Sequence, residues 1–316
     1  MDNLLRVPAL SVVIIVGARR ERFERCLASV LSQPIVAQIE VLVIDCAMEN
    51  APLPAGHDHP SVRLLRHGPR GSYGELRALG VQLVRGPLVA FLEEHVYVSV
   101  GWAAALLRAF EGPWAGVGGE VLNANPGIGI SDIVWIMNYD TLPPARRGLT
   151  QVLPGHNSAY RRDLLIGLGT NLAGLMESEA SLNWHLIARG YQLLIEPEVR
   201  FAHLNETDLL TICQGYYLWN RIFGATRVRL FAIGWPERLL RCLSVPIVPW
   251  WRVTRILARI ARYRPDLLPT CLRAIPIMLI AQYSGAIGMA VGMVVGKGAT
   301  AERFRNYELT IERRQR

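Results

Sequence analysis

The chain has 316 residues, enough to bury a large core either as one large domain or as a domain with an appendage. Charged residues make up 19% of it, below the roughly 25% that is usual for soluble domains, which indicates that some apolar surface meets lipid or a partner. The formal charge of +8 is compatible with anionic substrates, anionic membranes or nucleic acid.

The first half of the sequence alternates between predicted strands and predicted helices. Residues 10–16, 39–45 and 87–92 are apolar runs that predict strands, whereas residues 22–33 and 72–86 have apolar residues at helical spacing. The first run is a buried strand rather than a signal peptide, because a charged helical segment follows it directly. Such alternation predicts parallel strands joined by crossover helices, and therefore an α/β fold.

Polar side chains follow two of these strands. Asp45 ends one strand, and Glu93, Glu94 and His95 follow another. Ligands of open α/β sheets bind beyond the carboxyl ends of the strands. Carboxylate and imidazole groups are ligands for Mn²⁺ or Mg²⁺, with histidine favouring Mn²⁺. Each feature also has a simpler explanation, since acidic residues commonly end a strand and Asp45 alone could cap a turn.

The second half is less regular and then becomes helical. Loop-like segments fill the region from about 115 to 203, helical spacing begins near residue 208, and basic and apolar residues alternate from 235 to 296. Glu177 and Glu179 stand at the start of an amphipathic segment, where acids commonly favour the helix dipole. By themselves they indicate no chemistry.

Five segments in this order resemble the inverting family-2 nucleotide-sugar glycosyltransferases of the GT-A fold. They are LSVVIIVGARRERFERCLASVLSQ, EVLVIDCAMEN, FLEEHVYVSVGW, GHNSAYRRDLL and ESEASLNWHLIARGYQLLIEPEVRFAH. The resemblance implies a GT-A catalytic domain over residues 1–230 with a central, mostly parallel sheet. A basic and apolar helical region that associates with membrane would follow over residues 231–316.

The resemblance also implies the site. Glu179 takes the position of the catalytic base, which removes the proton of an acceptor hydroxyl while the nucleotide-sugar bond breaks with inversion. His95 and His203 take the positions of ligands for a divalent cation, Mn²⁺ or Mg²⁺, although Glu-Glu-His replaces the family's DxD. The residues implied in binding the nucleotide sugar are Asp45, Arg77, Glu93, Glu94, Asn157 and Arg161.

Two other classes of function compete with this one. A catalytically silent relative would use the same fold to bind a nucleotide or to scaffold a membrane assembly. A nucleic-acid binder would also fit the charge, but no helix-turn-helix, RNP or zinc pattern is visible, so we expect no nucleic-acid partner.

The C-terminal region predicts contact with a membrane. Residues 250–264 carry arginines on one side of a predicted helix and apolar residues on another, which is typical of an interfacial helix, although amphipathic helices mostly pack on protein. Ala274–Gly296 is uncharged and long enough to span, but basic residues flank both of its ends. Together with cysteines that form no CxxC pair, this predicts attachment to the cytosolic face without a crossing, where a lipid-linked sugar could be the acceptor. The two predicted faces are Arg252, Arg255, Arg259 and Arg262, and Val253, Ile256, Leu257 and Ile260.

Overall fold

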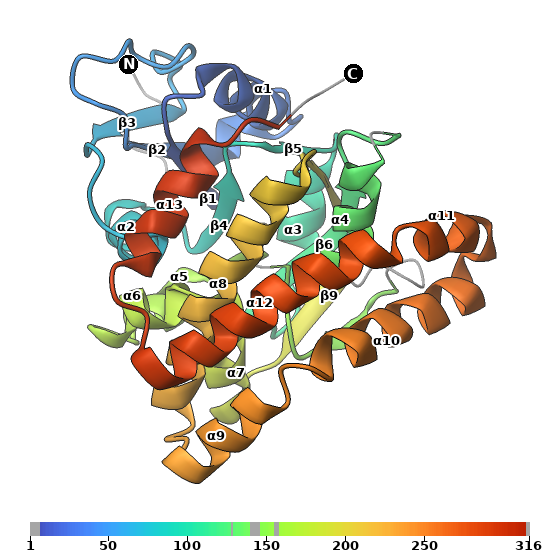
Figure 1. Cartoon of the computed structure of the whole chain (residues 1–316). Coiled ribbons are helices and arrows are strands. Elements are labelled where there is room, and N and C mark those ends of the chain that lie inside the picture. The colour runs from blue at the N-terminus through green and yellow to red at the C-terminus, as the bar shows by residue number, and fades with distance from the viewer. Residues whose placement is uncertain (1–6, 128, 140–145, 155–157, 314–316) are drawn as a thin grey trace. The chain divides into compact units, whose positions relative to one another are not determined.

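A computed structural model describes residues 7–127, 129–139, 146–154 and 158–313 (Figure 1). The chain divides into two compact units, which are described separately. The first comprises residues 1–122 and 145–203, and the second residues 123–144 and 204–316. The domain boundary that we predicted at residue 230 coincides with the end of a helix of the second unit, Leu209–Leu230, and remains a prediction.

Four parallel strands form the core of the first unit. They are adjacent in the order β3-β2-β1-β4, with every residue of β1, β2 and β4 buried. Their β-branched composition suits strands that are covered on both faces. The predicted α/β class with a central parallel sheet is thus confirmed. The strands are β1 (Leu10–Val16), β2 (Ile39–Asp45), β3 (Val62–Arg66) and β4 (Leu88–Glu93).

Shorter antiparallel strands extend the sheet beyond β4. The order continues β8-β6-β9-β5, and β7 also pairs with β9. In the β5–β9 pair Val96 lies opposite His203, which brings His203 next to the residues that follow β4. These strands are β5 (Val96–Val98), β6 (Gly116–Asn123), β7 (Gly148–Thr150), β8 (Ser158–Arg161) and β9 (Leu193–His203).

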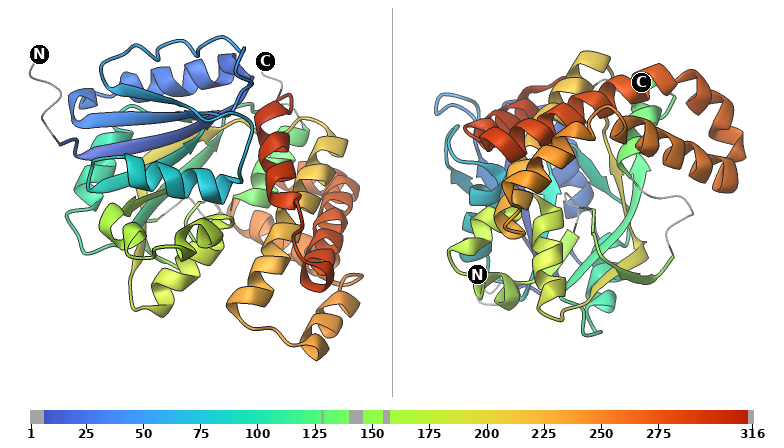
Figure 2. Two further views of the ribbon diagram at one scale, coloured as in Figure 1. Left: turned by 90° about the vertical axis from the view of Figure 1, so that its left-hand side faces the viewer. Right: turned by 60° about the horizontal axis from the view of Figure 1, so that its bottom comes forward.

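Helices cover both faces of the parallel core. Figure 2 (left) shows α1 and α2 on opposite faces of it. Right-handed crossovers require this, because the chain moves one way across the sheet from β1 to β2 and the other way from β3 to β4. α2 lies close to β1, since a Cβ added at Gly80 would stand 2.7 Å from Val13 Cγ1. The helices of this unit are α1 (Arg20–Leu31), η2 (Val36–Gln38), α2 (Tyr73–Leu83), α3 (Trp102–Ala109), α5 (Arg162–Ile166), α6 (Asn171–Met176) and α7 (Glu179–Ala188).

The second unit is helical in its described residues. Its two longest helices, α8 and α12, approach closely because glycines line their contact: a Cβ added at Gly288 would lie 2.3 Å from Tyr217 O, and one at Gly292 would lie 2.1 Å from Arg221 O. The helices are α4 (Ile130–Asn138), α8 (Leu209–Leu230), α9 (Trp235–Leu243), α10 (Val248–Tyr263), η3 (Pro265–Leu267), α11 (Leu268–Arg273), α12 (Ile275–Val295) and α13 (Thr300–Thr310).

The apolar side of α10 is covered by protein. Val253 and Ile260 join Ile133, Ile136 and Met278 in one buried cluster, against which Ile256 and Leu257 also pack. We expected this side to face lipid, and that expectation is wrong, since α4, α11 and α12 fill the space. Within the described part of the chain, α12 is one helix that is long and apolar enough, by length and composition alone, to cross a membrane, and it is partly buried.

Candidate functional site

Three potential metal ligands meet where β4 and β9 end. β4 ends at Glu93, His95 follows two residues later, and β9 ends at His203. The pairing of Val96 with His203 fixes their approach. Because the carboxylate comes from the end of the parallel core, the group occupies the sheet edge where α/β folds bind ligands.

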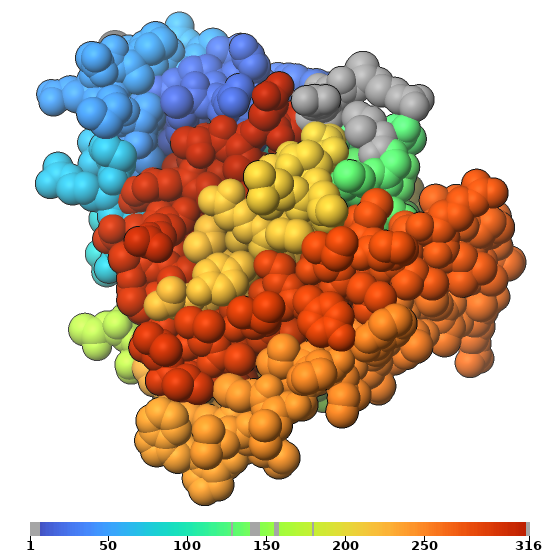
Figure 3. Space-filling view, in the orientation of Figure 1, coloured from blue at the N-terminus to red at the C-terminus, as the bar shows by residue number. Residues whose placement is uncertain are grey.

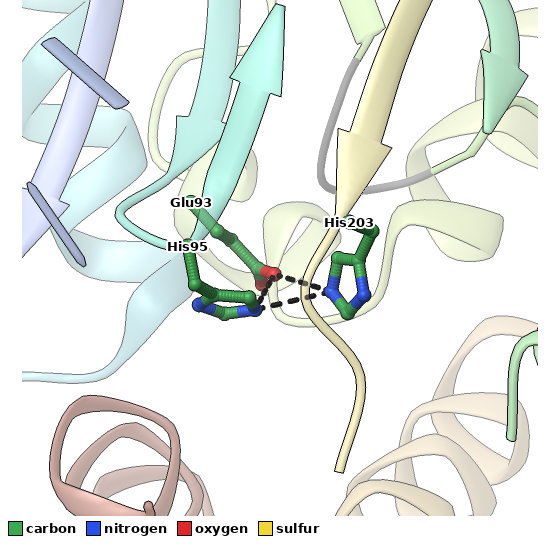
Figure 4. A group of neighbouring side chains, drawn as sticks. All are labelled: Glu93, His95 and His203. Atoms are coloured by element: carbon green, nitrogen blue, oxygen red, sulfur yellow. Dashed lines mark hydrogen bonds and ion pairs between the residues drawn. The ribbon is translucent and has the colours of Figure 1, made fainter. Parts of the chain in front are cut away.

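The three side chains point toward one another (Figure 4). Glu93 Oε2 lies 3.1 Å from His95 Nε2 and 3.6 Å from His203 Nε2. The two Nε2 atoms lie 3.1 Å apart, and all three side chains are buried. We call these residues the Glu-His-His cluster.

The donor set of the Glu-His-His cluster fits a divalent cation. Two neutral imidazoles and one carboxylate together carry one negative charge, and the three ligand atoms lie within 4.8 Å of one another. Mixed nitrogen and oxygen ligands suit Mn²⁺ better than Mg²⁺, which prefers oxygen alone. These residues could therefore hold a metal, with remaining coordination positions open to a ligand.

Arg77 reaches the cluster from α2. Its guanidinium lies 3.9 Å from Glu93 Oε1, donates to Met176 O at 3.4 Å and stacks over the Tyr73 ring at 5.3 Å. It is therefore positioned beside the metal-binding candidates, and its contact with a nucleotide sugar remains a prediction.

Glu94 points to a different part of the unit. Its carboxylate accepts hydrogen bonds from the Arg22 guanidinium and, at 2.7 Å, from the Gly17 backbone N–H. Glu94 and Arg22 are both buried. This pair ties the end of β4 to α1, and the role in nucleotide-sugar binding that the resemblance implies for Glu94 remains a prediction.

Asp45 is similarly occupied by protein groups. Arg20 donates to both of its carboxylate oxygens, each at 2.9 Å, and the Ala47 N–H donates to Oδ1 at 3.0 Å. Arg66 lies 3.5 Å from Oδ2. The role of Asp45 in binding the nucleotide sugar remains a prediction, and a nucleotide at this position would meet arginines as well as the carboxylate. Sequence reasoning missed Arg20 and Arg66, although the run ARRER directly after the first strand was a signal.

Arg161 is not brought to the Glu-His-His cluster. It pairs with Leu88 at the start of β4, whereas Glu93 ends that strand, so about 16 Å of strand separates them. Its guanidinium donates to three backbone carbonyls between residues 110 and 114, at 2.7 to 2.9 Å. The arginine thus holds a loop at the opposite edge of the sheet.

The remaining candidates lie at or beyond the limits of what the structure describes. α7 begins at Glu179, whose side chain lies outside the described part, as does the whole of Asn157. Glu177, the other acid of that segment, accepts a hydrogen bond from Ser72 Oγ at 2.6 Å, where Ser72 caps α2. The carboxylate of Glu177 therefore supports the start of α2.

Comparisons with known proteins agree with this architecture. The model of Glycosyl transferase family 2 matches residues 11–169, about half of the chain. A mannosyltransferase, PcManGT from Pyrobaculum calidifontis, solved in complex with GDP-Man and Mn²⁺, is 17% identical, with a TM-score of 0.57 over 92% of this chain and 88% of its own. GalNAc-T7, solved with UDP, GalNAc and Mn²⁺, is 20% identical, with a TM-score of 0.49 over 63% of this chain and 44% of its own. No curated protein matches the sequence.

Proposed function

The chain belongs to Glycosyl transferase family 2 and has the GT-A fold, and from this premise we propose that it transfers a sugar from a nucleotide-diphospho-sugar to a hydroxyl acceptor. The observation that carries the proposal is the Glu-His-His cluster at the carboxyl ends of the strands, where a family member would bind its donor. The fold neighbour PcManGT, solved with GDP-Man and Mn²⁺, supports the pairing of nucleotide sugar with cation.

We propose that Glu93, His95 and His203 hold the cation. A divalent cation bound there would neutralise the charge that develops on the departing nucleoside diphosphate. The guanidinium of Arg77, beside Glu93, would assist by donating to the diphosphate oxygens. These side chains are buried, so little water competes with the interactions.

We propose Glu179 as the general base. The acceptor oxygen forms its bond to the anomeric carbon while the bond from that carbon to the diphosphate oxygen breaks, and Glu179 takes the acceptor's proton. A single displacement of this kind inverts the anomeric centre. General-base assistance is typically worth about 10²–10⁴ in rate.

We further propose that the acceptor is lipid-linked and that the protein works at the cytosolic face of a membrane. The apolar, basic C-terminal helices support this proposal, because they would keep the enzyme beside such an acceptor.

A thermal-shift screen of nucleotide sugars, with and without Mn²⁺, tests the proposed function. We expect at least one nucleoside-diphosphate sugar to raise the melting temperature, and to do so more strongly with Mn²⁺, because a ligand that binds only the folded state stabilises it. If no member of a panel of UDP-, GDP-, ADP- and dTDP-sugars shifts the melting temperature, the proposed function is wrong.

The variant Glu179→Gln tests the assignment of the base. With the donor found in the screen, we expect turnover to fall by about 10²-fold or more, since the amide cannot take the proton. Donor affinity should stay within about twofold, because the base contacts the acceptor rather than the donor. A matched Glu177→Gln variant should keep most of the activity, and turnover of Glu179→Gln within about tenfold of the parent would contradict the assignment.

A further inference from the structure

Helix α9 is amphipathic, but its apolar side is the exposed one. Trp235, Leu239 and Leu243 recur at every fourth residue and so share one side of the helix, with Leu240 beside them. These four side chains are between 55% and 75% exposed. A helix that packs on a soluble protein presents the opposite arrangement, with its apolar side covered.

The opposite side of α9 carries its polar residues, and one of them, Arg238, contacts other parts of the second unit. Arg238 donates to Ile233 O at 2.8 Å and to Met293 O, on α12, at 3.4 Å. Arg241 pairs with Glu237 on the same helix. The hydrogen bonds of Arg238 thus lie on the side of α9 that is opposite to its leucines.

The exposed apolar surface continues into the start of α10. Tyr283 OH on α12 donates to Pro246 O at 2.9 Å, and the Trp251 N–H donates to Ile247 O at 3.1 Å, so the connecting turn is anchored. Figure 3 shows α9 and the first turns of α10 in orange at the surface, along the lower part of the view. We call the exposed apolar side chains of this stretch the α9 patch: Trp235, Leu239, Leu240, Leu243, Ile247, Trp250 and Trp251.

The charge around the α9 patch is predominantly positive. Residues 235–266 contain seven arginines and two acidic residues, Glu237 and Asp266. The Arg238 guanidinium lies over the Trp235 ring at 4.9 Å, and that of Arg255 over the Trp251 ring at 4.6 Å. Arginines stacked on exposed tryptophans match the headgroup level of a bilayer, where aromatic rings and long basic side chains collect.

We propose that the α9 patch inserts into the interface of a membrane that contains anionic lipids. Its leucines and tryptophans would enter the boundary between headgroups and acyl chains, while the surrounding arginines, including Arg255 and Arg262, meet lipid phosphates. This surface keeps the two tryptophans and the arginines of the predicted interfacial helix, but its apolar part comes mainly from α9, because α10 buries its own apolar side and α12 buries its glycine-lined side inside the second unit. The inference does not depend on the proposed glycosyl transfer.

Vesicle co-sedimentation of the whole chain tests the proposal without metal or sugar nucleotide. We expect binding to vesicles of about three parts phosphatidylcholine to one part phosphatidylglycerol, weaker binding to pure phosphatidylcholine, and weakening by salt. The variant Leu239→Gln/Leu240→Gln/Leu243→Gln should lower the vesicle affinity about tenfold or more. The matched control is Leu210→Gln, because Leu210 is 80% exposed on α8 and outside the patch.

Two further measurements keep the test decisive. The melting temperature of the triple variant should equal that of the parent, because the substituted side chains are exposed. Brominated lipids should quench tryptophan fluorescence of the parent, and less so after Trp250→Phe/Trp251→Phe. The proposal is overturned if the parent ignores anionic vesicles or if the triple variant binds them as the parent does. It is also overturned if the triple substitution only splits a lipid-free dimer, which would assign the patch to a second copy.

Discussion

Three acidic side chains lie where β2 and β4 end, and their carboxylates have different neighbours. Those of Asp45 and Glu94 meet arginines of α1, whereas that of Glu93 meets histidines. Asp45 and Glu94 each receive an arginine of α1 together with a backbone N–H. Glu93 directs one oxygen toward two imidazoles, with Arg77 at 3.9 Å from the other oxygen. All belong to the same sheet edge, yet only the cluster around Glu93 gathers donor atoms that a cation could bind.

A carboxylate at this edge of the sheet can therefore either stabilise the fold or bind a ligand, and its residue type and position do not decide between these roles. Arg20 and Arg22 neutralise Asp45 and Glu94 within the protein, so these carboxylates already stabilise the fold. Glu93 has the Arg77 guanidinium at a longer distance, 3.9 Å, and turns its other oxygen to two imidazoles, which are metal ligands only when they are unprotonated. The largest effects on stability are therefore expected at α1, and those on metal binding at β9.

The largest stability effect is expected for Arg22→Met. It leaves Glu94 buried without its arginine, and breaking a buried ion pair by removing one partner typically costs about 3–5 kcal/mol in unfolding free energy. Chemical denaturation measures the loss. Arg25→Met, at an exposed position of the same helix, is the control and should cost under about 1 kcal/mol.

A double variant makes this prediction sharper. Arg22→Met/Glu94→Gln removes the uncompensated charge and should recover at least about half of the lost stability. Equal stabilities of the single and double variants would show that Arg22 acts by packing rather than by pairing.

A smaller loss is expected for Asp45→Asn. The amide keeps one acceptor oxygen but loses the charge that binds Arg20 at two atoms, which should cost about 2 kcal/mol of unfolding free energy. If Asp45 also binds the nucleotide sugar, the donor affinity of Asp45→Asn should fall as well. The donor affinity of the Asp45→Glu variant should then also stay below that of the parent. If Asp45→Asn melts at the parental temperature, Arg20 contributes no stabilising pair.

The smallest effect, at the other edge of the sheet, depends on pH. Burial raises the pKa of the Glu40 carboxyl, but hydrogen bonds from Ser11 and Arg85 outweigh it and hold that pKa below its usual range. Because the pKa is lower in the folded state, Glu40 stabilises the fold above the unfolded-state pKa, about 4.3, and this stabilisation is lost as pH falls through the folded-state pKa. Glu40→Gln should therefore cost about 1 kcal/mol at pH 7, since Arg85 is partly exposed.

Denaturation of the parent and of Glu40→Gln at several pH values measures this effect. The difference in unfolding free energy should shrink as the pH falls into the acidic range. A difference that is the same at neutral and acidic pH would contradict the linkage.

Much of the fold could be predicted from the sequence, because its signals are local. The runs of β-branched residues at 10–16 and 39–45 predicted the strands, and the helical spacing between them predicted the crossovers. That Glu93 and His203 approach each other could be anticipated only from the family resemblance, since the β5–β9 register that joins them is not a local property. Their binding of a cation remains a prediction.

Other features could not be predicted, because a periodic pattern shows which residues share a side but not what covers it. The pattern of α10 correctly grouped Val253 with Ile260, yet protein covers them rather than lipid. The exposure of the apolar side of α9, and the contact of Arg238 with Met293 O on α12, are features that no pattern in WPERLLRCL reveals. The arginine pairs of α1 are tertiary contacts of the same kind.

Calorimetric titration of Mn²⁺ into the parent and into His95→Ala tests the central claim most directly. We predict one Mn²⁺ per parent chain and an affinity lower by about 100-fold or more in His95→Ala, since the variant loses one of three ligands. His59→Ala is the control. His59 Nδ1 accepts a hydrogen bond from the Ser61 N–H just before β3, so this substitution should leave the Mn²⁺ affinity unchanged. If folded His95→Ala binds Mn²⁺ as tightly as the parent, the Glu-His-His cluster is not the metal site and the account is contradicted.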